Sequence, residues 1–237
     1  MRMKLSVIIP VLNEREQLPC AVRALQSQSS DLEIIIVDGG SSDGTREWLQ
    51  QQSDLIFIEA ERGRGIQLNA GAKIASGEAL LFLHGDCLLP ITAVTAIHHA
   101  LLSTETCGGA FLIRFAEARP RSLGIIAKGI NARTLVTQTA TGDQGIFVRR
   151  ATFASVGGFA DWPLFEDVDF VTRLKRCGRF AILREPITIS ARRYLAFGPW
   201  RTTFLMYALR IAYWCGVHPA KLYQRFQDVR PHFKNVG

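Results

Sequence analysis

Residues 33–45 read Glu-Ile-Ile-Ile-Val-Asp-Gly-Gly-Ser-Ser-Asp-Gly-Thr, a run of β-branched residues that passes directly into a loop of small and polar residues. A short apolar run that ends in a turn sequence is typical of a buried strand. Apolar residues recur at helical spacing before this stretch, in Glu16–Ser29, and a second helical segment follows it at Asp43–Gln52. The stretch therefore predicts a buried strand between two helices.

The same alternation extends in both directions through the first ninety residues. Further strands are predicted at Leu5–Pro10, Leu55–Glu59 and Glu78–His84, with another helix at Gly65–Ser76. Short apolar strands separated by helices of about ten residues predict a parallel sheet that is covered on both faces. Because crossovers between parallel strands are right-handed, the expected fold class is α/β, with a doubly wound, Rossmann-like sheet.

The pattern is less regular after Pro90. We predict helices at Ile91–Leu102, Arg121–Val136 and Asp167–Cys177, and strands at Gly109–Phe115, Gly145–Arg149, Phe180–Leu183 and Ile187–Ser190. The tail is predicted to be helical at Trp200–Cys215 and Ala220–Asp228, with a break between them. We expect one continuous domain over residues 1–198, followed by a helical extension over residues 199–237.

Composition excludes several classes of protein. Of the 237 residues, 48% are hydrophobic and 21% are charged, a globular balance and not a disordered one. The apolar run after Met1 is too short for a signal peptide, and no run reaches the roughly 18 residues that span a bilayer. The five cysteines are odd in number and form no Cys-x-x-Cys pair, which favours a reducing cytoplasm.

The net charge of +7 lies at one end of the chain. Residues 192–237 contain Arg192, Arg193, Arg201, Arg210, Lys221, Arg225, Arg230 and Lys234, against Asp228 as the single acidic residue. A basic tail can face nucleic acid, anionic lipid or an acidic ligand. Nucleic acid is not expected, because the tail contains no recognisable reading module.

Polar side chains follow each of the first four predicted strands, at the edge of an open parallel sheet where ligands bind. These loops are Asn13-Glu14, Asp38-Gly-Gly-Ser-Ser-Asp43-Gly-Thr45, Glu61-Arg62-Gly-Arg64-Gly and His84-Gly-Asp86. Each could be only a turn or a helix cap. Four such loops on one edge favour a ligand site instead.

The residue types suggest how these loops divide the chemistry. A carboxylate at Asp38 can accept hydrogen bonds from a base or ribose. Arg62 and Arg64, flanked by glycines, suit a diphosphate. Asp86, with His84 two residues earlier, could bind Mg²⁺ or Mn²⁺ while substrate phosphates complete the coordination.

The order of these motifs resembles the family 2 glycosyltransferases of GT-A fold over nearly the whole chain. The matching segments are Pro10–Glu14, Ile36–Thr45, Arg62–Gly71, residues 84–86, Gly142–Arg150, Gly157–Phe159 and Phe165–Asp169. Gly142–Gly145 and Ser190–Tyr194 are most similar to a short bacterial subgroup, the radical-SAM/selenodomain-associated transferases 2, also called arsenosugar-biosynthesis glycosyltransferases. The resemblance implies a nucleotide-binding half at 1–90 and an acceptor-side half at 91–198.

The resemblance also implies roles for individual residues. The nucleotide-sugar would be held by Pro10, Asn13, Glu14, Asp38, Gly40, Arg62, Arg64, Asn69, His84, Arg192 and Arg193. Asp86 would bind the metal, while His84, which stands where the family commonly has Asp, could ligate the metal or hydrogen-bond to sugar. Asp167, next to Glu166, would be the catalytic general base, and Asp143 and Gln144 would line the acceptor side.

The implied reaction is an inverting, metal-assisted transfer of a hexosyl group from a nucleotide-diphosphate sugar, for which the family favours UDP, to an unidentified hydroxyl acceptor. The acidic pair at 166–167 could instead be ordinary charge at a helix N-terminus. A nucleotide-sugar-binding module without transfer activity is one alternative function. A nucleotidyltransferase is another, although it usually carries a Gly-rich loop with lysine where Asn13-Glu14 stand.

The segment Phe204–Cys215 is aromatic and flanked by arginines, but it is too interrupted to span a membrane. It could lie on an anionic membrane surface, at the inner face of the cytoplasmic membrane. Packing against the catalytic domain, or against a second subunit in a homodimer, is the favoured interpretation. The arginines at 192–193 could close over a diphosphate or form a solvated basic loop.

Overall fold

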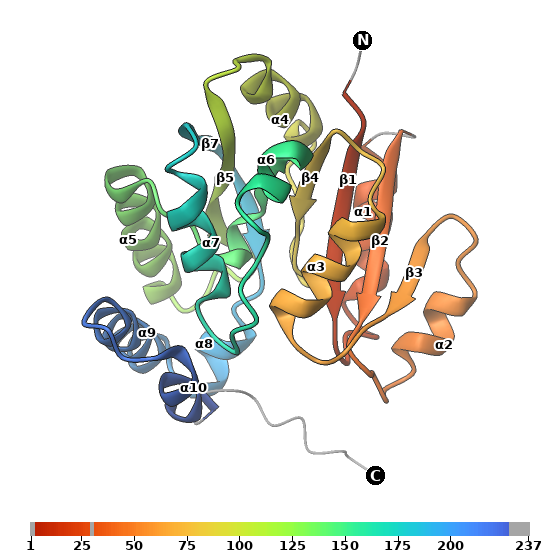
Figure 1. The fold of residues 1–237 in the computed structure, drawn as a ribbon. Coiled ribbons are helices and arrows are strands. Elements are labelled where there is room, and N and C mark those ends of the chain that lie inside the picture. The colour runs from red at the N-terminus through yellow and green to blue at the C-terminus, as the bar shows by residue number, and fades with distance from the viewer. Residues whose placement is uncertain (1–2, 29–30, 228–237) are drawn as a thin grey trace.

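The computed structural model describes residues 3–28 and 31–227 and shows one seven-stranded sheet flanked by helices (Figure 1). The strand order is β3-β2-β1-β4-β6-β5-β7. The strands are β1 (Leu5–Val11), β2 (Leu32–Asp38), β3 (Ile56–Glu59), β4 (Ala79–Phe82), β5 (Thr106–Phe115), β6 (Ile146–Arg149) and β7 (Arg179–Ile189). The mostly parallel α/β sheet expected from the sequence is thereby confirmed.

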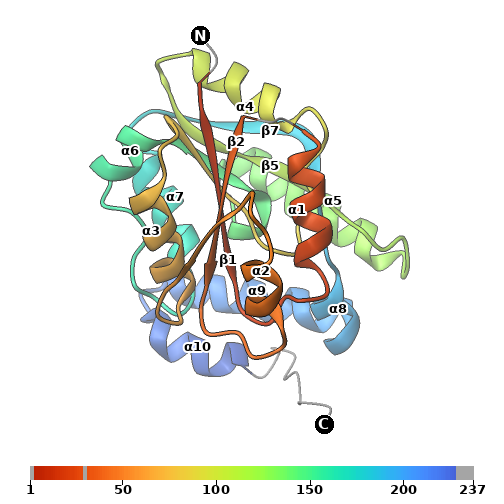
Figure 2. The ribbon, with the colours of Figure 1, turned by 90° about the vertical axis from the view of Figure 1, so that its right-hand side faces the viewer.

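Helices cover both faces of the sheet (Figure 2). One face carries α1 (Leu18–Gln26), α2 (Thr45–Gln50), α4 (Ala93–Leu102) and α5 (Ser122–Thr137). The other carries α3 (Arg64–Ile74), α6 (Arg150–Ser155) and α7 (Glu166–Leu174). Successive residues of β1 alternate between the two faces, so Val7 and Ile9 pack with α1 whereas Ile8 packs with α3.

The direction of β6 places the loops of both halves of the chain at one edge of the sheet. β4 pairs parallel to β1 on one side and antiparallel to β6 on the other. The carboxyl ends of β1 and β4 therefore meet the amino end of β6. A short 3₁₀ turn at Gly142–Gln144 precedes β6 and lies at this edge. The chain reverses its direction of winding between β1 and β4, the point at which open α/β sheets bind ligands.

The structure differs from the predicted elements in several places. Phe180–Leu183 and Ile187–Ser190 were predicted as two strands, but β7 is one strand because it pairs with β5 across a register shift near Phe111. The basic segment at 192–194 is not a loop but the start of helix α8 (Arg192–Phe197). Helix α6 was not predicted, since six residues are too few to show a periodicity.

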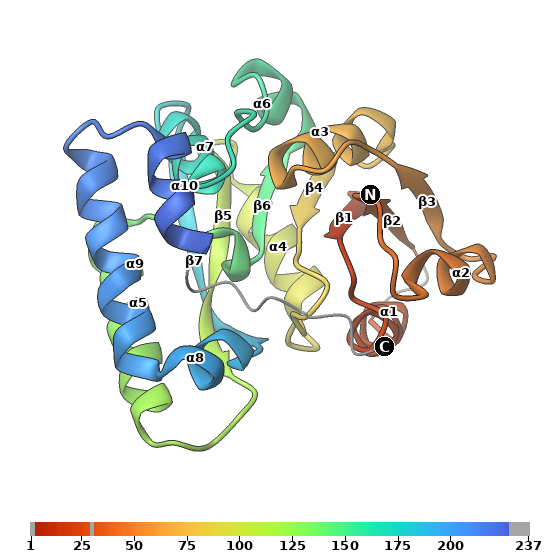
Figure 3. The same ribbon diagram turned by 90° about the horizontal axis from the view of Figure 1, so that it is seen from below.

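The C-terminal helices α9 (Pro199–Trp214) and α10 (Pro219–Gln227) form a separate apolar cluster at the ligand edge of the sheet (Figure 3). One side of α9, including Leu209, packs with Leu164 and Phe165 before α7 and with Phe226 of α10. The predicted packing of this segment against the catalytic domain is therefore present for one of its faces.

Some predictions concern residues outside the described ranges. These are the last residue of the first predicted helix, Ser29, the end of the last one, Asp228, and the basic residues Arg230 and Lys234. No helix in the described ranges is long and apolar enough to cross a membrane. The proposed division of the chain at residues 90 and 198 stays a prediction.

Helix α3 approaches the sheet closely at Gly71. A Cβ atom at this position would lie 2.5 Å from Ile8 Cγ2 and 3.0 Å from Val37 Cγ2, on β1 and β2. Gly124 of α5 is also helical, but a Cβ atom there meets no atom within 4 Å. The two glycines therefore differ in packing and not in secondary structure.

We predict opposite effects of alanine at these two positions. Gly71→Ala should lower the free energy of unfolding by about 1–3 kcal/mol, because the extra methyl group overpacks the contact between α3 and the sheet. Gly124→Ala should raise it by about 0.5–1 kcal/mol, because it only reduces the conformational freedom of the unfolded chain. Urea-induced unfolding measures both, and equal stability of the two variants would contradict this packing.

Candidate active site

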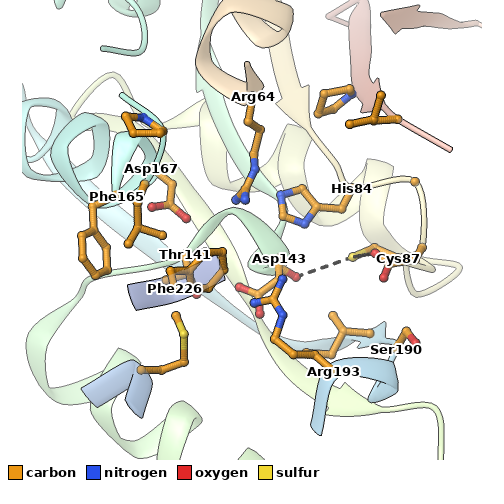
Figure 4. Close-up of a pocket in the computed structure, with 18 of the residues that line it drawn as sticks. Arg64, His84, Cys87, Thr141, Asp143, Phe165, Asp167, Ser190, Arg193 and Phe226 are labelled. Carbon is orange, nitrogen blue, oxygen red and sulfur yellow. Dashed lines mark hydrogen bonds between the residues drawn. The ribbon is translucent and has the colours of Figure 1, made fainter. Parts of the chain in front are cut away.

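A cavity of about 870 Å³ opens at the ligand edge of the sheet (Figure 4). Its first half is lined by the loops after β1, β3 and β4, at residues 10–14, 62–64 and 84–87. Its second half is lined by residues 161–165, by Arg193 and Tyr194 of α8 and by parts of α5, α9 and α10, while Arg192 of α8 lies with the first half. Asp143 and Asp167 lie where the two halves meet.

Asn13 holds the loops after β1 and β2 together. Its backbone adopts φ 58°, a left-handed conformation that asparagine tolerates. Its side-chain Oδ1 accepts a hydrogen bond from Ser42 N at 2.8 Å, and its own N–H donates to Ser41 Oγ at 2.9 Å. The next residue, Glu14, then lies in the wall of the cavity.

Arg192 links the loops after β1 and β4. Its Nη2 atom lies 3.1 Å from Glu14 Oε2 and 3.2 Å from Asp86 Oδ2. Burial raises the pKa of Glu14, Arg192 opposes this rise, and the nearby Asp86 adds to it. The two carboxylates are therefore held close together with one guanidinium between them.

His84, Asp86 and Cys87 form a cluster whose donor atoms lie within 4.8 Å of one another. Burial and the nearby Arg64 lower the pKa of His84, so its ring is neutral at pH 7, and its Nε2 has no hydrogen-bond partner among the described residues. Burial, with Asp86 and Asp143 nearby, raises the pKa of Cys87 well above its usual value. The thiol therefore remains protonated.

Asp167 is fixed by backbone amides at the start of α7. Gly142 N donates to its Oδ2 at 2.6 Å and Val168 N to its Oδ1 at 2.7 Å. Phe165, the N-cap residue, adopts φ 65°, an uncommon conformation for a bulky residue, and so turns the chain into the helix. A Cβ at Gly142 would lie 2.8 Å from His84 Nε2 and 3.3 Å from Asp167 Oδ2. Any larger residue at position 142 would therefore have to displace His84 and crowd Asp167.

Arg64 points toward the acidic residues of the cavity (Figure 4). Its Nε lies 3.2 Å from Oε1 of the buried Glu166. Glu166 raises the pKa of Arg64, burial opposes this, and Asp167, Asp143 and Asp86 act in the same direction as Glu166. One guanidinium thus lies among four carboxylates.

Most of the sequence-predicted site residues lie together. Those in the cavity wall are Pro10, Asn13, Glu14, Arg62, Arg64, His84, Asp86, Asp143, Asp167, Arg192 and Arg193. Glu166 is not part of the wall, but its carboxylate contacts Arg64, which is. The other predicted site residues that lie outside the wall are Asp38, Gly40, Asn69 and Gln144.

Asp38, the last residue of β2, and Gly40, in the loop that follows it, do not line the cavity. The Asp38 side chain is 0% exposed, and its carboxylate accepts hydrogen bonds from Gly40 N and Ser41 N and from the Ser41 hydroxyl. Asp38 therefore holds its own loop in this structure, and a base could reach it only if the loop rearranged. Its predicted role toward the nucleoside stays a prediction.

Asn69 and Gln144 also differ from expectation. The Asn69 side chain exchanges two hydrogen bonds with the backbone of Phe159. Asn69 Nδ2 donates to the Phe159 carbonyl oxygen, and Phe159 N donates to Asn69 Oδ1, each at 2.9 Å. Gln144 was expected to line the acceptor side, but it is fully buried and donates to Phe111 O at 2.9 Å. Its polar side chain is satisfied by the core, so it contributes to the position of the 3₁₀ turn.

Sequence reasoning missed several residues of the wall. Gln67 of α3 donates to Val11 O at 2.9 Å and to Val37 O at 2.8 Å, so it bridges the ends of β1 and β2. Cys87 directly follows the candidate metal-binding triplet at residues 84–86. This position in the sequence could have identified it as a residue of the wall. Arg133 of α5 and Arg210 of α9 reach the cavity only through tertiary packing, which no local pattern indicates.

Two of the three residues of the cluster, Asp86 and His84, fit a divalent cation. Asp86 supplies a hard carboxylate oxygen, and the unpartnered Nε2 of the neutral His84 is free to accept a ligand bond or a hydrogen bond. Mg²⁺ and Mn²⁺ usually take one or two protein carboxylates and complete their coordination with substrate phosphates. Protonated Cys87 does not suit such an ion.

Comparison with protein families finds a match to the model described as glycosyl transferase family 2, over residues 6–155. Glycosyltransferase AglE of Haloferax volcanii is 38% identical over 91 residues, which is 35% of this chain and 30% of AglE. A PGL/p-HBAD biosynthesis glycosyltransferase of Mycobacterium bovis is 27% identical over 71% of this chain and 72% of its own length. The chain therefore spans less than a third of one relative and most of the other.

Solved structures give the same fold. TarS of S. aureus, residues 1–349, has a TM-score of 0.64 and 19% identity, over 89% of this chain and 64% of its own. The mannosyltransferase PcManGT of Pyrobaculum calidifontis, solved with GDP-Man and Mn²⁺, has a TM-score of 0.66 and 22% identity, over 88% of this chain and 63% of its own. These neighbours confirm the GT-A fold, while the subgroup expected from residues 142–145 and 190–194 stays a prediction.

The position of Arg192 between two carboxylates predicts effects of opposite sign on two ligands. Arg192→Ala should tighten the binding of Mn²⁺ alone several-fold, by about 1 kcal/mol, because it removes a positive charge next to Asp86. It should weaken the binding of a nucleoside diphosphate with Mn²⁺, because a guanidinium that suits phosphate is lost.

Titration of Mn²⁺ followed by electron paramagnetic resonance measures the first effect, and calorimetry measures the second. Arg201→Ala, which removes an exposed arginine of α9, is the control and should change neither. Weaker binding of Mn²⁺ alone to Arg192→Ala would contradict the placement of the cation at Asp86.

Proposed function

Because the chain belongs to glycosyl transferase family 2, we propose that its cavity transfers a hexosyl group from a nucleotide-diphosphate sugar to an acceptor hydroxyl, with inversion at the anomeric carbon. The observation that carries this proposal is the convergence of Asp167 and His84 on Gly142, at the junction of the two halves of the cavity, with Asp86 in the same cavity wall. A base on one side of the junction and a diphosphate site on the other are what a single displacement needs.

Asp167 is the proposed general base. Two backbone amides hold its carboxylate in one orientation, and each oxygen keeps lone pairs for an acceptor hydroxyl. The acceptor oxygen forms a bond to the anomeric carbon as its proton passes to Asp167. The bond from that carbon to the diphosphate breaks, and the diphosphate departs with the electron pair.

The first half of the cavity is the proposed donor site. Arg64 and Arg192 are each held by carboxylates, so they are oriented before a diphosphate arrives and can exchange those partners for its oxygens. A structure of TarS holds UDP-GlcNAc and that of PcManGT holds GDP-Man. These complexes support a nucleotide-sugar donor, and we propose UDP as its nucleotide.

Asp86, with His84 as a second candidate ligand, would hold Mg²⁺ or Mn²⁺. A cation bound there would neutralise the negative charge that grows on the diphosphate. Arg64 and Arg192 would act on the same charge from the protein side.

The exposed face of α9 supports a second proposal, contact with an anionic membrane surface. Trp200, Phe204, Ile211 and Trp214 share one face of the helix and are exposed. α5 lies beside α9 (Figure 3), and neither helix contains an acidic residue. Apolar and aromatic residues beside basic ones suit anionic lipid.

A second copy of the chain fits this face less well than lipid does. The exposed charged residues of the two helices are Arg121 at the start of α5, Lys128 and Arg201, all of them basic. A two-fold interface brings the same patch of both copies together, so these charges would repel one another.

Replacing the base should separate transfer from donor binding. Asp167→Asn should lower the transfer rate about 10²–10⁴-fold, because the amide cannot take the acceptor proton. It should leave donor binding intact. A thermal-shift panel of UDP-, GDP- and dTDP-sugars with and without Mn²⁺ measures binding and ranks the nucleotides. Release of nucleoside diphosphate measures turnover.

Asp169→Asn is the matched control, because Asp169 lies on the same helix and pairs with Arg173 away from the cavity wall. It should keep both activities. Loss of donor binding in Asp167→Asn would contradict the base assignment. Nucleotide binding without turnover by the wild type would support the binding-module alternative instead.

Vesicle co-sedimentation tests the membrane proposal. Wild type should bind phosphatidylglycerol-containing vesicles more than phosphatidylcholine vesicles, and Phe204→Ser should lose much of this binding. Leu102→Ser is the control, since Leu102 is 74% exposed and Phe204 70%, but Leu102 lies on α4. Equal binding by both variants would contradict the proposal, and a dimer lost only in Phe204→Ser would assign the face to a second copy.

A further inference from the structure

The second half of the cavity extends beyond Asp167 and takes no part in the donor chemistry proposed above. Its walls are largely aromatic, with Trp162 from the loop before α7, Tyr207 from α9, and Tyr223 and Phe226 from α10. Aromatic walls with a few polar groups are typical of sites for organic ligands. The polar side chains among these aromatic ones therefore indicate which class of ligand the second half of the cavity binds.

Arg210 is a buried cation in this wall. The residue lies on α9, lines the cavity and is 6% exposed. Its Nη1 atom is buried and has no hydrogen-bond partner among the residues that the structure describes. The ion pairs found within residues 3–28 and 31–227 do not include Arg210.

A positively charged side chain with a buried, unpartnered nitrogen is unfavourable. Arginine stays protonated at any physiological pH, so Arg210 cannot relieve the cost of its burial by losing its charge. The remaining way to offset that cost is an anion that binds beside it. The free protein thus presents a charge whose partner is absent from the described chain.

Arg133 places a second guanidinium in the same wall, from α5, which lies beside α9 (Figure 3). Its Nη2 donates to Gln144 Oε1 at 3.3 Å, but its buried Nε has no hydrogen-bond partner within the described part of the chain. Of the acidic residues in this region, Asp161 is exposed to solvent and Asp143 lies beside Arg193 (Figure 4). Among the described residues, neither these two nor Asp167 forms an ion pair or hydrogen bond with Arg133 or Arg210.

We infer that this half of the cavity binds the anionic group, a phosphate or a carboxylate, of an acceptor whose body is aromatic or otherwise apolar. Arg210 contacts the anion, with Arg133 beside it, and the aromatic side chains contact the body. The inference rests on the proposed function in one respect, because it takes the bound anion to be part of the acceptor.

Three small probes of similar size distinguish the contribution of a phosphate, of a carboxylate and of a neutral group to binding. Phenyl phosphate and sodium benzoate carry the two candidate anions on a ring, and benzyl alcohol is their neutral counterpart. Each is titrated by calorimetry in the presence of saturating UDP and Mn²⁺, which occupy the donor site. Inorganic phosphate, titrated in the same way, shows whether the ring contributes.

At least one anionic probe should bind, at least tenfold more tightly than benzyl alcohol. Arg210→Met should lose this binding at least tenfold, Arg210→Lys should keep part of it, and Arg201→Met, an exposed change on the same helix, should keep all of it. Without any ligand, Arg210→Met should unfold at the same temperature as wild type or a higher one, since it removes an unpaired buried charge.

Two results would overturn the inference. One is unchanged binding of the anionic probes to Arg210→Met. The other is a lower unfolding temperature of Arg210→Met without ligand, which would show that Arg210 is a structural residue. Absence of UDP binding to the wild type would count against the proposed function alone, because the probes can then be titrated without nucleotide.

Discussion

The pairing of β4 with β1 on one side and with β6 on the other is the constraint on which the site depends. β1 and β4 run parallel, so the loops at their carboxyl ends lie side by side. β6 runs the other way, and the segment that precedes it therefore arrives at the same edge. Gly142 in that segment donates to Asp167 of α7 and lies so close to His84 that a Cβ atom there would meet its ring. Residues separated by more than eighty positions are thereby fixed around one point.

The charges of the site are arranged before any ligand binds. Arg192 lies between Glu14 and Asp86, and Arg64 lies next to Glu166, so two arginines that suit a diphosphate are already held in place by carboxylates. Such contacts reduce the reorganisation that binding requires, which is one source of catalytic power in polar sites. They also mean that an incoming anion competes with carboxylates of the protein. The cation expected at Asp86 would lower that competition by taking over one of these carboxylates.

The fold and the first half of the site were largely predictable from local pattern. Buried strands such as residues 33–38 have an unambiguous apolar signature, and the loops that follow parallel strands must share one edge. The function of individual loop residues was less predictable. Asp38 and Gln144 carry the polar groups that ligand sites use, yet their side chains satisfy backbone groups of the protein itself. Arg210 could not be foreseen, since its burial results from how α9 packs on the segment before α7, a contact between distant parts of the chain.

The apolar cluster around α9 and α10 shares no residue with the two clusters that hold the sheet. The C-terminal helices close the second half of the cavity while the core of the domain is packed without them. Sequence change in this segment can therefore accumulate with little effect on the folding of the sheet or on the loops after β1 and β4. During evolution, a chain built in this way can acquire a new acceptor by remodelling its C-terminus while it inherits its donor chemistry unchanged.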